Sequence, residues 1–216
     1  MVRISCCGDS ITFGLMASAP EYSYPCVMQK LLGEEYIVNN FGKSGATVIA
    51  DYDFQEGRLY GPYLKSEEYP AAMASDPDIV VLMLGMNDGN PTHCFNEKNG
   101  GALSESYVAL YEKTLSDILT GFGDLASKPQ LFLCRTSAMR REAGKVFSAE
   151  YVHHFTENLK MIRKVQEKLA DRFQIPLIDT LTGMDDPSYY QDGVHLTDTG
   201  YAKLAEIIAA AIKKEA

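Results

Sequence analysis

The sequence predicts an α/β fold in which a parallel β-sheet carries helices on both faces. Five short apolar runs recur along the chain, and amphipathic stretches separate them. Short apolar runs bounded by turn residues are typical of buried strands, and strands that alternate with helices need crossovers that make neighbouring strands parallel. The 216 residues suffice for one well-buried core and are few for two, so we expect one domain over residues 1–216.

The predicted strands are the five apolar runs, and we expect all of them to be buried. They span residues 2–7, 36–41, 79–84, 131–134 and 175–178. Ligands of such sheets bind outside the carboxyl ends of the strands, near a change in strand order. Polar residues that follow the strands should therefore gather at that edge.

The predicted helices lie between and after these strands, at residues 23–32, 69–74, 104–120, 148–173 and 197–214. Ser23 is expected to cap the first of them, with Pro25 in its first turn, and Ser104 and Thr197 precede acidic residues where helix starts favour them. The connections 45–68 and 89–103 are long. Long loops at the carboxyl edge usually shape a binding site, so we expect them to set specificity.

The charge balance disfavours several classes of partner. Lys and Arg number 20 against 29 Asp and Glu, for a formal net charge of −9, and such a field repels nucleic acid and anionic membrane surfaces. No run approaches the length of a membrane span, so we expect no membrane insertion. A small-molecule substrate is the expected partner, and homo-oligomerisation stays open.

The cysteines indicate a reducing compartment. There are five, an odd number without CxxC spacing, and Cys6 and Cys7 stand side by side in an apolar run. The first residues are too polar and their apolar run is too short for a signal peptide, so we expect a cytoplasmic protein. A secretory leader removed ahead of this start would leave the same sequence, and secretion remains the alternative.

Two polar motifs at opposite ends of the chain together hold the groups of a serine hydrolase. Gly8-Asp9-Ser10 follows the first predicted strand, where glycine permits a sharp bend that lifts the serine out at an exposed turn. In Asp192-Gly-Val-His195 the carboxylate can reach back to accept the Nδ1 proton of the imidazole, which leaves Nε2 to deprotonate Ser10. Either motif alone is also ordinary turn chemistry, and only their combination and order carry the prediction.

Asn87 supplies a candidate oxyanion donor. Its side-chain amide follows the third predicted strand, and a glycine among residues 42–45 could add a backbone N–H beside that of Ser10. Each segment also has a plainer interpretation, since Asn87-Asp88 suits an Asx turn and residues 42–45 suit a flexible loop. The position after a central strand favours the catalytic interpretation of Asn87.

The chain resembles the SGNH hydrolases, also called GDSL esterases, over its whole length. The invariant groups of that family correspond here to Ser10, Gly45, Asn87 and His195. Asp192 completes the triad, and Ile11 stands where the family motif has leucine. The resemblance implies a flavodoxin-like three-layer α/β/α sandwich with a five-stranded parallel sheet. It also implies an acyl-serine mechanism on esters or thioesters that uses no metal and no cofactor, with Ser10, Gly45 and Asn87 forming the oxyanion hole.

Further residues near the strand ends are candidates for substrate binding, namely Asp9, Asp88, Tyr52, Tyr60 and Arg135. The connection 51–69 also carries Phe54, Tyr63 and Tyr69, and its aromatic rings could stack on a sugar or simply anchor a long loop. Arg135, with Arg140 and Arg141, could hold a substrate anion or form a solvated basic loop. The plainer interpretation is favoured in both cases.

No metal site is expected. His93 and Cys94 share a loop, and His153 and His154 are adjacent on a predicted helix, where neighbouring side chains point apart.

The leading functional hypothesis is an esterase that removes short acyl groups such as acetyl from a carbohydrate or another small polar substrate. A lysophospholipase or acyl-thioesterase is the first alternative, and a noncatalytic glycan-binding module is the second. A flavin-binding flavodoxin-like protein is disfavoured because Asp9 would repel phosphate where that fold binds it.

Overall fold

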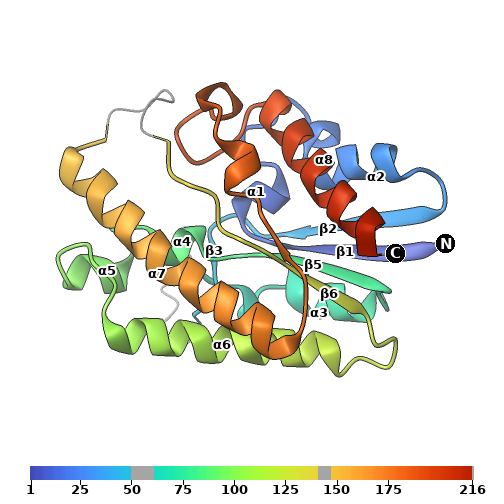
Figure 1. Ribbon diagram of the computed structural model, residues 1–216, viewed down its shortest axis with the longest axis horizontal. Coiled ribbons are helices and arrows are strands. Elements are labelled where there is room, and N and C mark those ends of the chain that lie inside the picture. The colour runs from blue at the N-terminus through green and yellow to red at the C-terminus, as the bar shows by residue number, and fades with distance from the viewer. Residues whose placement is uncertain (50–60, 141–146, 216) are drawn as a thin grey trace.

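The computed structural model describes residues 1–49, 61–140 and 147–215 and shows the α/β architecture (Figure 1). The five strands of the main sheet are all parallel and run in the order β2-β1-β5-β6-β7. Their bounds are β1 Val2–Gly8, β2 Tyr36–Gly42, β5 Ile79–Met83, β6 Gln130–Cys134 and β7 Leu177–Ile178. The strand order reverses at β1, so the crevice expected for a ligand lies at its carboxyl end, beside β5. The predicted fold class is confirmed.

Helices cover both faces of this sheet (Figure 1). One face carries α2 (Tyr24–Leu32) and α8 (Asp198–Glu215), and the opposite face carries α3 (Glu68–Ala74), α6 (Glu105–Gly123) and α7 (Ala149–Phe173). The core lies in the two interfaces between helices and sheet, where the largest buried side chains include Tyr24, Phe122, Phe132 and Phe155. No helix in the described ranges has both the length and the apolar character that a membrane span requires.

Two of the three predicted helix caps form, and a third cap was not predicted. The hydroxyl of Ser104 accepts from Tyr107 N at 3.2 Å, and the hydroxyl of Thr197 accepts from Gly200 N at 3.2 Å. Ser148 caps α7 in the same way. The expectation for Ser23 is wrong, because its hydroxyl instead donates to the carbonyl of Pro20 at 2.8 Å and makes no cap bond to α2.

The structure departs from the sequence prediction at edge strands and in short elements. The strand β2 is not buried as expected, because it lies at one edge of the sheet, where Ile37 stays 37% exposed. The other edge strand, β7, keeps only the last two residues of the predicted strand. Several elements were not predicted at all. They are α1 (Ser10–Phe13), α4 (Met86–Gly89), α5 (Cys94–Lys98), the paired strands β3 (Ala46–Thr47) and β4 (Gly61–Pro62), and four 3₁₀ turns at Pro20–Tyr22, Tyr63–Lys65, Thr182–Met184 and Pro187–Tyr189.

The end of β2 touches the backbone of α1, and only glycine allows that approach. A Cβ atom on Gly42 would lie 2.1 Å from the nitrogen of Phe13 and 2.5 Å from the carbonyl carbon of Thr12. Both atoms belong to backbone, so neither can rotate away. The position of α1 on the sheet is therefore fixed by the absence of a side chain at residue 42.

We expect Gly42→Ala to destabilise the protein by about 2–3 kcal/mol, because either β2 or α1 must shift to admit the methyl group. For a chain of this length the loss corresponds to a fall of about 5–10 °C in the thermal midpoint. Gly123→Ala is the matched control, since its new Cβ would meet only Leu131 Cδ1 at 3.9 Å. Equal midpoints for the two variants in thermal denaturation would show that the contact does not constrain α1.

Candidate active site

Ser10 is the first residue of α1, directly beyond the carboxyl end of β1. Asp9 turns the chain between the two elements and caps α1, with its carboxylate accepting from Ile11 N at 3.0 Å. Gly8 closes the strand where a Cβ atom would lie 2.5 Å from the carbonyl oxygen of Met83. Ser10 is only 5% exposed, so the expectation of an exposed turn is wrong. The short helix presses the serine against its surroundings and holds it in one place.

The histidine loop meets Ser10 from the other end of the chain. Ser10 Oγ lies 2.9 Å from His195 Nε2, and His195 Nδ1 lies 2.9 Å from an Asp192 carboxylate oxygen. The second oxygen of Asp192 accepts from the backbone N–H groups of Val194 and His195 at 3.0 and 2.8 Å. These bonds fix the carboxylate, and the carboxylate in turn orients the imidazole.

Gly193 lets this loop pack against the segment that follows β6. Its φ is 91°, and a Cβ atom there would lie 2.5 Å from the carbonyl oxygen of Arg140. The two backbones are joined by a hydrogen bond from Arg140 N to Gly193 O at 2.8 Å. A side chain at residue 193 would push His195 away from Ser10.

The charge of Asp192 is secured by its hydrogen bonds. Burial raises the pKa of this carboxyl, but the bonds from the His195 ring and backbone, with the Val194 N–H, lower the pKa to about 2. Asp192 is therefore ionised at neutral pH and accepts a proton held on His195 Nδ1. In that tautomer Nε2 has a free lone pair directed at the Ser10 hydroxyl.

Asn87 lies on α4, and Gly45 directly precedes β3. Gly85, with φ 122°, begins the turn that carries Asn87, whose side-chain amide donates to the carbonyl of Ala46 at 2.8 Å. This bond uses one of the two amide hydrogens. Gly45 has φ 77° and directly precedes Ala46, so the same bond ties the glycine to Asn87. Lys43 N donates to the carbonyl of Gly8 at 2.8 Å, which attaches this segment to the end of β1.

Two of the candidate substrate-binding carboxylates are buried structural groups. Asp9 is 1% exposed and caps α1, and Asp88 is 0% exposed and accepts from the backbone N–H groups of Val48 and Ile49. Neither side chain can reach a ligand from these positions. The sequence prediction for both is wrong, because each carboxylate turns inward to satisfy backbone donors.

Arg135 is also not placed as predicted. Its guanidinium forms ion pairs with Glu167 at 3.2 Å and Asp179 at 3.6 Å, so its charge is already matched within the protein. Arg140 donates to the carbonyl of Met184 at 3.2 Å. These two arginines have partners within the protein and form neither the anion site nor the solvated loop that the sequence suggested, and Arg141 lies outside the described residues.

The aromatic candidates divide between described and undescribed residues. Tyr52, Phe54 and Tyr60 lie outside the described residues. Tyr63 is buried and donates its hydroxyl to the carbonyl of Phe41 at 2.7 Å, and Tyr69 packs edge-on against it. These two tyrosines anchor the connection to the sheet, which is the plainer of the two expectations.

Two buried amides on α7 were missed by the sequence analysis. Asn158 Nδ2 donates to the carbonyls of Gly89 at 3.0 Å and Gly101 at 2.9 Å. Gln166 Nε2 donates to the carbonyl of Leu84 at 3.0 Å, and its oxygen accepts from Thr136 N at 3.0 Å. Both hold the loops that follow β5 and β6. Their signal was present in the sequence, since each interrupts the apolar stripe of a long amphipathic helix.

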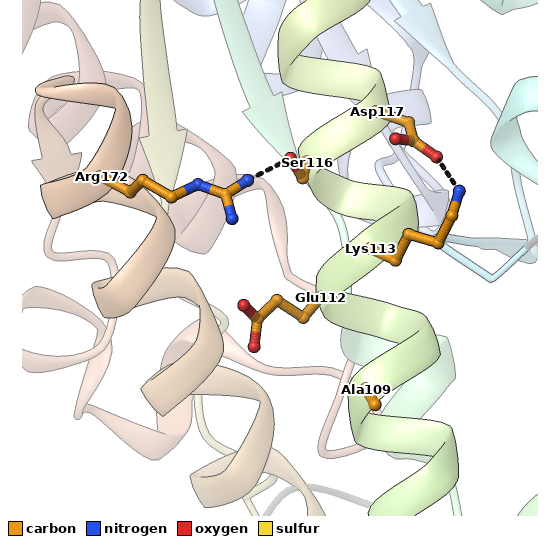
Figure 2. Close-up of a pocket in the computed structure, with 6 residues that line it drawn as sticks. All are labelled: Ala109, Glu112, Lys113, Ser116, Asp117 and Arg172. Carbon is orange, nitrogen blue, oxygen red and sulfur yellow. Dashed lines mark hydrogen bonds and ion pairs between the residues drawn. The ribbon is translucent and has the colours of Figure 1, made fainter.

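A surface hollow of about 380 Å³ between α6 and α7 is separate from the Ser10 site (Figure 2). It is lined by Ala109, Glu112, Lys113, Ser116, Asp117 and Arg172. Lys113 pairs with Asp117 at 2.7 Å, Glu112 pairs with Lys168 at 2.7 Å, and Arg172 donates to the hydroxyl of Ser116. Each of its charged side chains thus has a partner on α6 or α7, and none of its lining residues belongs to the Ser10 site.

The described parts of the chain contain no group of three or more His, Cys, Asp and Glu side chains arranged to hold a metal ion. The residues that the structure does bring together, Ser10, His195 and Asp192, form a hydrogen-bonded line of hydroxyl, imidazole and carboxylate. Such an arrangement suits acyl transfer through serine.

Comparison with known proteins also indicates an acyl hydrolase. The family model of GDSL-like lipases and acylhydrolases matches residues 6–203. An acetylxylan esterase from Xylanibacter ruminicola is 30% identical in an alignment 226 residues long, gaps included. The alignment covers 98% of this chain and 43% of that protein. The chain therefore spans less than half the length of this curated relative.

Two solved structures share the fold. The aryl esterase of M. smegmatis is 20% identical, with a TM-score of 0.73, over 99% of this chain and 99% of that one. A carbohydrate acetylesterase family member from Sinorhizobium meliloti is 21% identical, with a TM-score of 0.68, over 99% of this chain and 98% of that one. With the family match over nearly the whole sequence, the expected resemblance is confirmed: the chain belongs to the GDSL-like lipase/acylhydrolase family of carboxylic ester hydrolases.

Proposed function

We propose that this protein is a serine esterase that removes acetyl groups from a carbohydrate, with Ser10 as nucleophile, His195 as general base and Asp192 as its orienting partner. The observation that supports the proposal most is the unbroken hydrogen-bonded line from Ser10 Oγ through His195 to Asp192. Each member also has the environment that its role needs. The serine is fixed by α1, and the aspartate is ionised at neutral pH.

The proposed reaction proceeds in two acyl transfers. Ser10 Oγ attacks the ester carbonyl while His195 Nε2 takes the hydroxyl proton, and the imidazolium then protonates the departing alcohol oxygen. A water molecule, deprotonated by the same nitrogen, attacks the acyl-serine and releases the acid, which restores the Ser10 hydroxyl. Asp192 stays ionised throughout and stabilises the imidazolium that forms in each half.

The oxyanion of each tetrahedral intermediate needs donors that are fixed before the reaction. The N–H of Ser10 belongs to the first turn of α1, where helical N–H groups lack partners within the helix. The second amide hydrogen of Asn87 and the N–H of Gly45 complete the proposed hole. Their attachment to rigid strand ends makes them suitable for charge that develops only in the transition state.

The choice of an acetylated carbohydrate rests on relatives. The acetylxylan esterase that matches 98% of the chain and the S. meliloti structure are both named for carbohydrate acetyl esters. Esters of increasing acyl length, assayed beside acetylated xylo-oligosaccharides, test the choice. A preference for long acyl chains would favour the lysophospholipase or thioesterase alternative.

We expect Ser10→Ala to lower esterase turnover by about 10⁴-fold or more while the fold is kept, because the variant lacks the only proposed nucleophile. A serine-directed organophosphorus reagent should add one group to the parent and none to the variant, as read by intact-mass spectrometry. Near-parental turnover by the variant would exclude the triad. A parent that neither turns over nor reacts would favour the glycan-binding module.

Asp192→Asn should lower kcat/KM by about 10²–10⁴-fold, because an amide that donates to Nδ1 favours the wrong imidazole tautomer. The parent should keep its orienting carboxylate ionised far below neutral pH, because the pKa of Asp192 is about 2. Kinetic pH profiles of the two proteins check both points, and an unchanged rate in the variant would remove Asp192 from the mechanism.

Asn87→Ala should lower kcat by about 10²-fold or more with little change in KM, because the amide is proposed to stabilise charge formed only in the transition state. Steady-state kinetics on a short acyl ester separate the two constants. A change confined to KM would assign Asn87 to ground-state binding of the substrate.

A further inference from the structure

We propose that the buried carboxylate of Asp88 is a positioning residue of the oxyanion hole, which holds the Gly45 segment in register with Asn87. The inference rests on the proposed function, since it concerns the same acyl-serine chemistry. It assigns Asp88 a role different from the substrate contact that the sequence suggested.

The contacts of Asp88 are directed at one short piece of backbone. One carboxylate oxygen lies 3.1 Å from Val48 N and 3.2 Å from Ile49 N, and the other lies 3.0 Å from Val48 N. The side chain is completely buried, and these partners are backbone N–H groups of residues 48 and 49. A carboxylate that accepts from consecutive N–H groups fixes both the position and the orientation of that backbone.

Asp88 and its neighbour Asn87 both bind the backbone of residues 46–49. Asn87 donates to the carbonyl of Ala46 at 2.8 Å, while Asp88 accepts from the N–H groups two and three residues later. Gly45 directly precedes residues 46–49 and has no side chain through which it could bind α4. Its N–H therefore takes its place relative to the Asn87 amide from these two anchors.

The helix that carries both anchors is itself fixed to the body of the protein. Asn96 Nδ2 donates to the carbonyl of Asp88 at 2.8 Å, and Asn158 Nδ2 donates to the carbonyl of Gly89 at 3.0 Å. Gly89 also packs so closely on Leu159 that a Cβ atom would lie 2.7 Å from its Cδ2. Because α4 cannot easily move, the Asp88 bonds transmit its position to residues 45–49.

The anchor depends on the charge of Asp88. Burial raises the pKa of this carboxyl to about 7, although the N–H groups of Val48 and Ile49 act to lower it. Two titratable groups are coupled to it within the described residues: Asp9 at the end of β1, whose charge raises the pKa further, and Tyr111 of α6. Protonation removes the charge that strengthens these bonds and turns one oxygen into a hydroxyl, so the neutral carboxyl holds the two N–H groups less firmly than the carboxylate does.

The test is Asp88→Asn, which keeps the shape of the side chain and imitates its uncharged form. With a neutral short acyl ester at pH 8.5, we expect kcat to fall by about 10–100-fold and KM to change little, because the donors are displaced while the triad stays intact. Toward pH 6 the kcat ratio of parent to variant should shrink, because the parent's own Asp88 becomes protonated through a pKa near 7. A ratio that is constant across this pH range would overturn the proposal.

Asn158→Ala is the matched control, because it removes hydrogen bonds to the loop around α4 without touching residues 45–49. We expect a lower thermal midpoint and a kcat ratio that does not depend on pH. A pH-dependent ratio in this control would show that general loosening, rather than the Asp88 charge, produces the effect, and would count against the proposal.

The proposed function and the proposed role of Asp88 can be contradicted separately. If the parent shows no turnover and no labelling of Ser10, the proposed function is wrong. If the parent is active and Asp88→Asn matches it in kcat at pH 8.5, only the role of Asp88 is wrong. Should the variant not fold, the parent's kcat profile decides, since the proposal requires Asp88 to contribute an ionisation near pH 7, and a profile without one overturns it.

Discussion

The carboxyl end of β1 is the point from which the whole site is built. This strand pairs with β2 on one side and β5 on the other, so Gly8 is matched with both Gly42 and Met83. Nothing larger than hydrogen fits on Gly8 or Gly42, where the backbones of three strands and α1 converge. This close packing fixes the position of Ser10. It also fixes the segment around Gly45, which follows the neighbouring strand β2 at the same edge of the sheet. The small residues at this edge thus set the geometry on which every later contact depends.

The second half of the site is brought to Ser10 by α8. The carboxylate of Asp198, at the start of this helix, accepts from Ser18 N at 2.9 Å and from its hydroxyl at 2.5 Å. One turn later, Tyr201 donates its hydroxyl to the carbonyl of Leu15 at 2.7 Å. These bonds join the loop after α1 to the helix that follows His195, so Ser10 and His195 share one local framework. The packing of α8 beside α2, visible in Figure 1, extends that framework across one face of the sheet.

The parts of this structure that could be predicted from sequence are those with a local signal. The five strands appear as apolar runs and the five longer helices show a hydrophobic period. The positions of Ser10 and Asn87 follow from strand ends, and that of His195 follows from the start of the last helix. The single-turn helices α1 and α4 are too short to show such a period. Contacts with distant residues hold them in shape instead. The local sequence also does not show whether a carboxylate that follows a strand points into the protein or toward a ligand. This is why Asp9 and Asp88 were assigned to substrate binding. Arg135 was misassigned for a related reason, since its partners Glu167 and Asp179 lie far along the chain.

The three carboxylates around the site respond to pH in opposite ways. Burial raises the pKa of Asp9 to about 6 and that of Asp88 to about 7 in the folded protein, above the ordinary value of 3.8. Both groups therefore hold protons that the unfolded chain releases, and their contribution to stability declines as pH rises from about 4 to about 7. Asp192, with a folded pKa of about 2, contributes stability that is present above its ordinary value and is lost as pH falls toward 2. At neutral and higher pH the fold thus carries buried charge that costs stability. That charge lies beside Ser10 and the Gly45 segment, where the proposed catalysis needs fixed acceptors for backbone N–H groups.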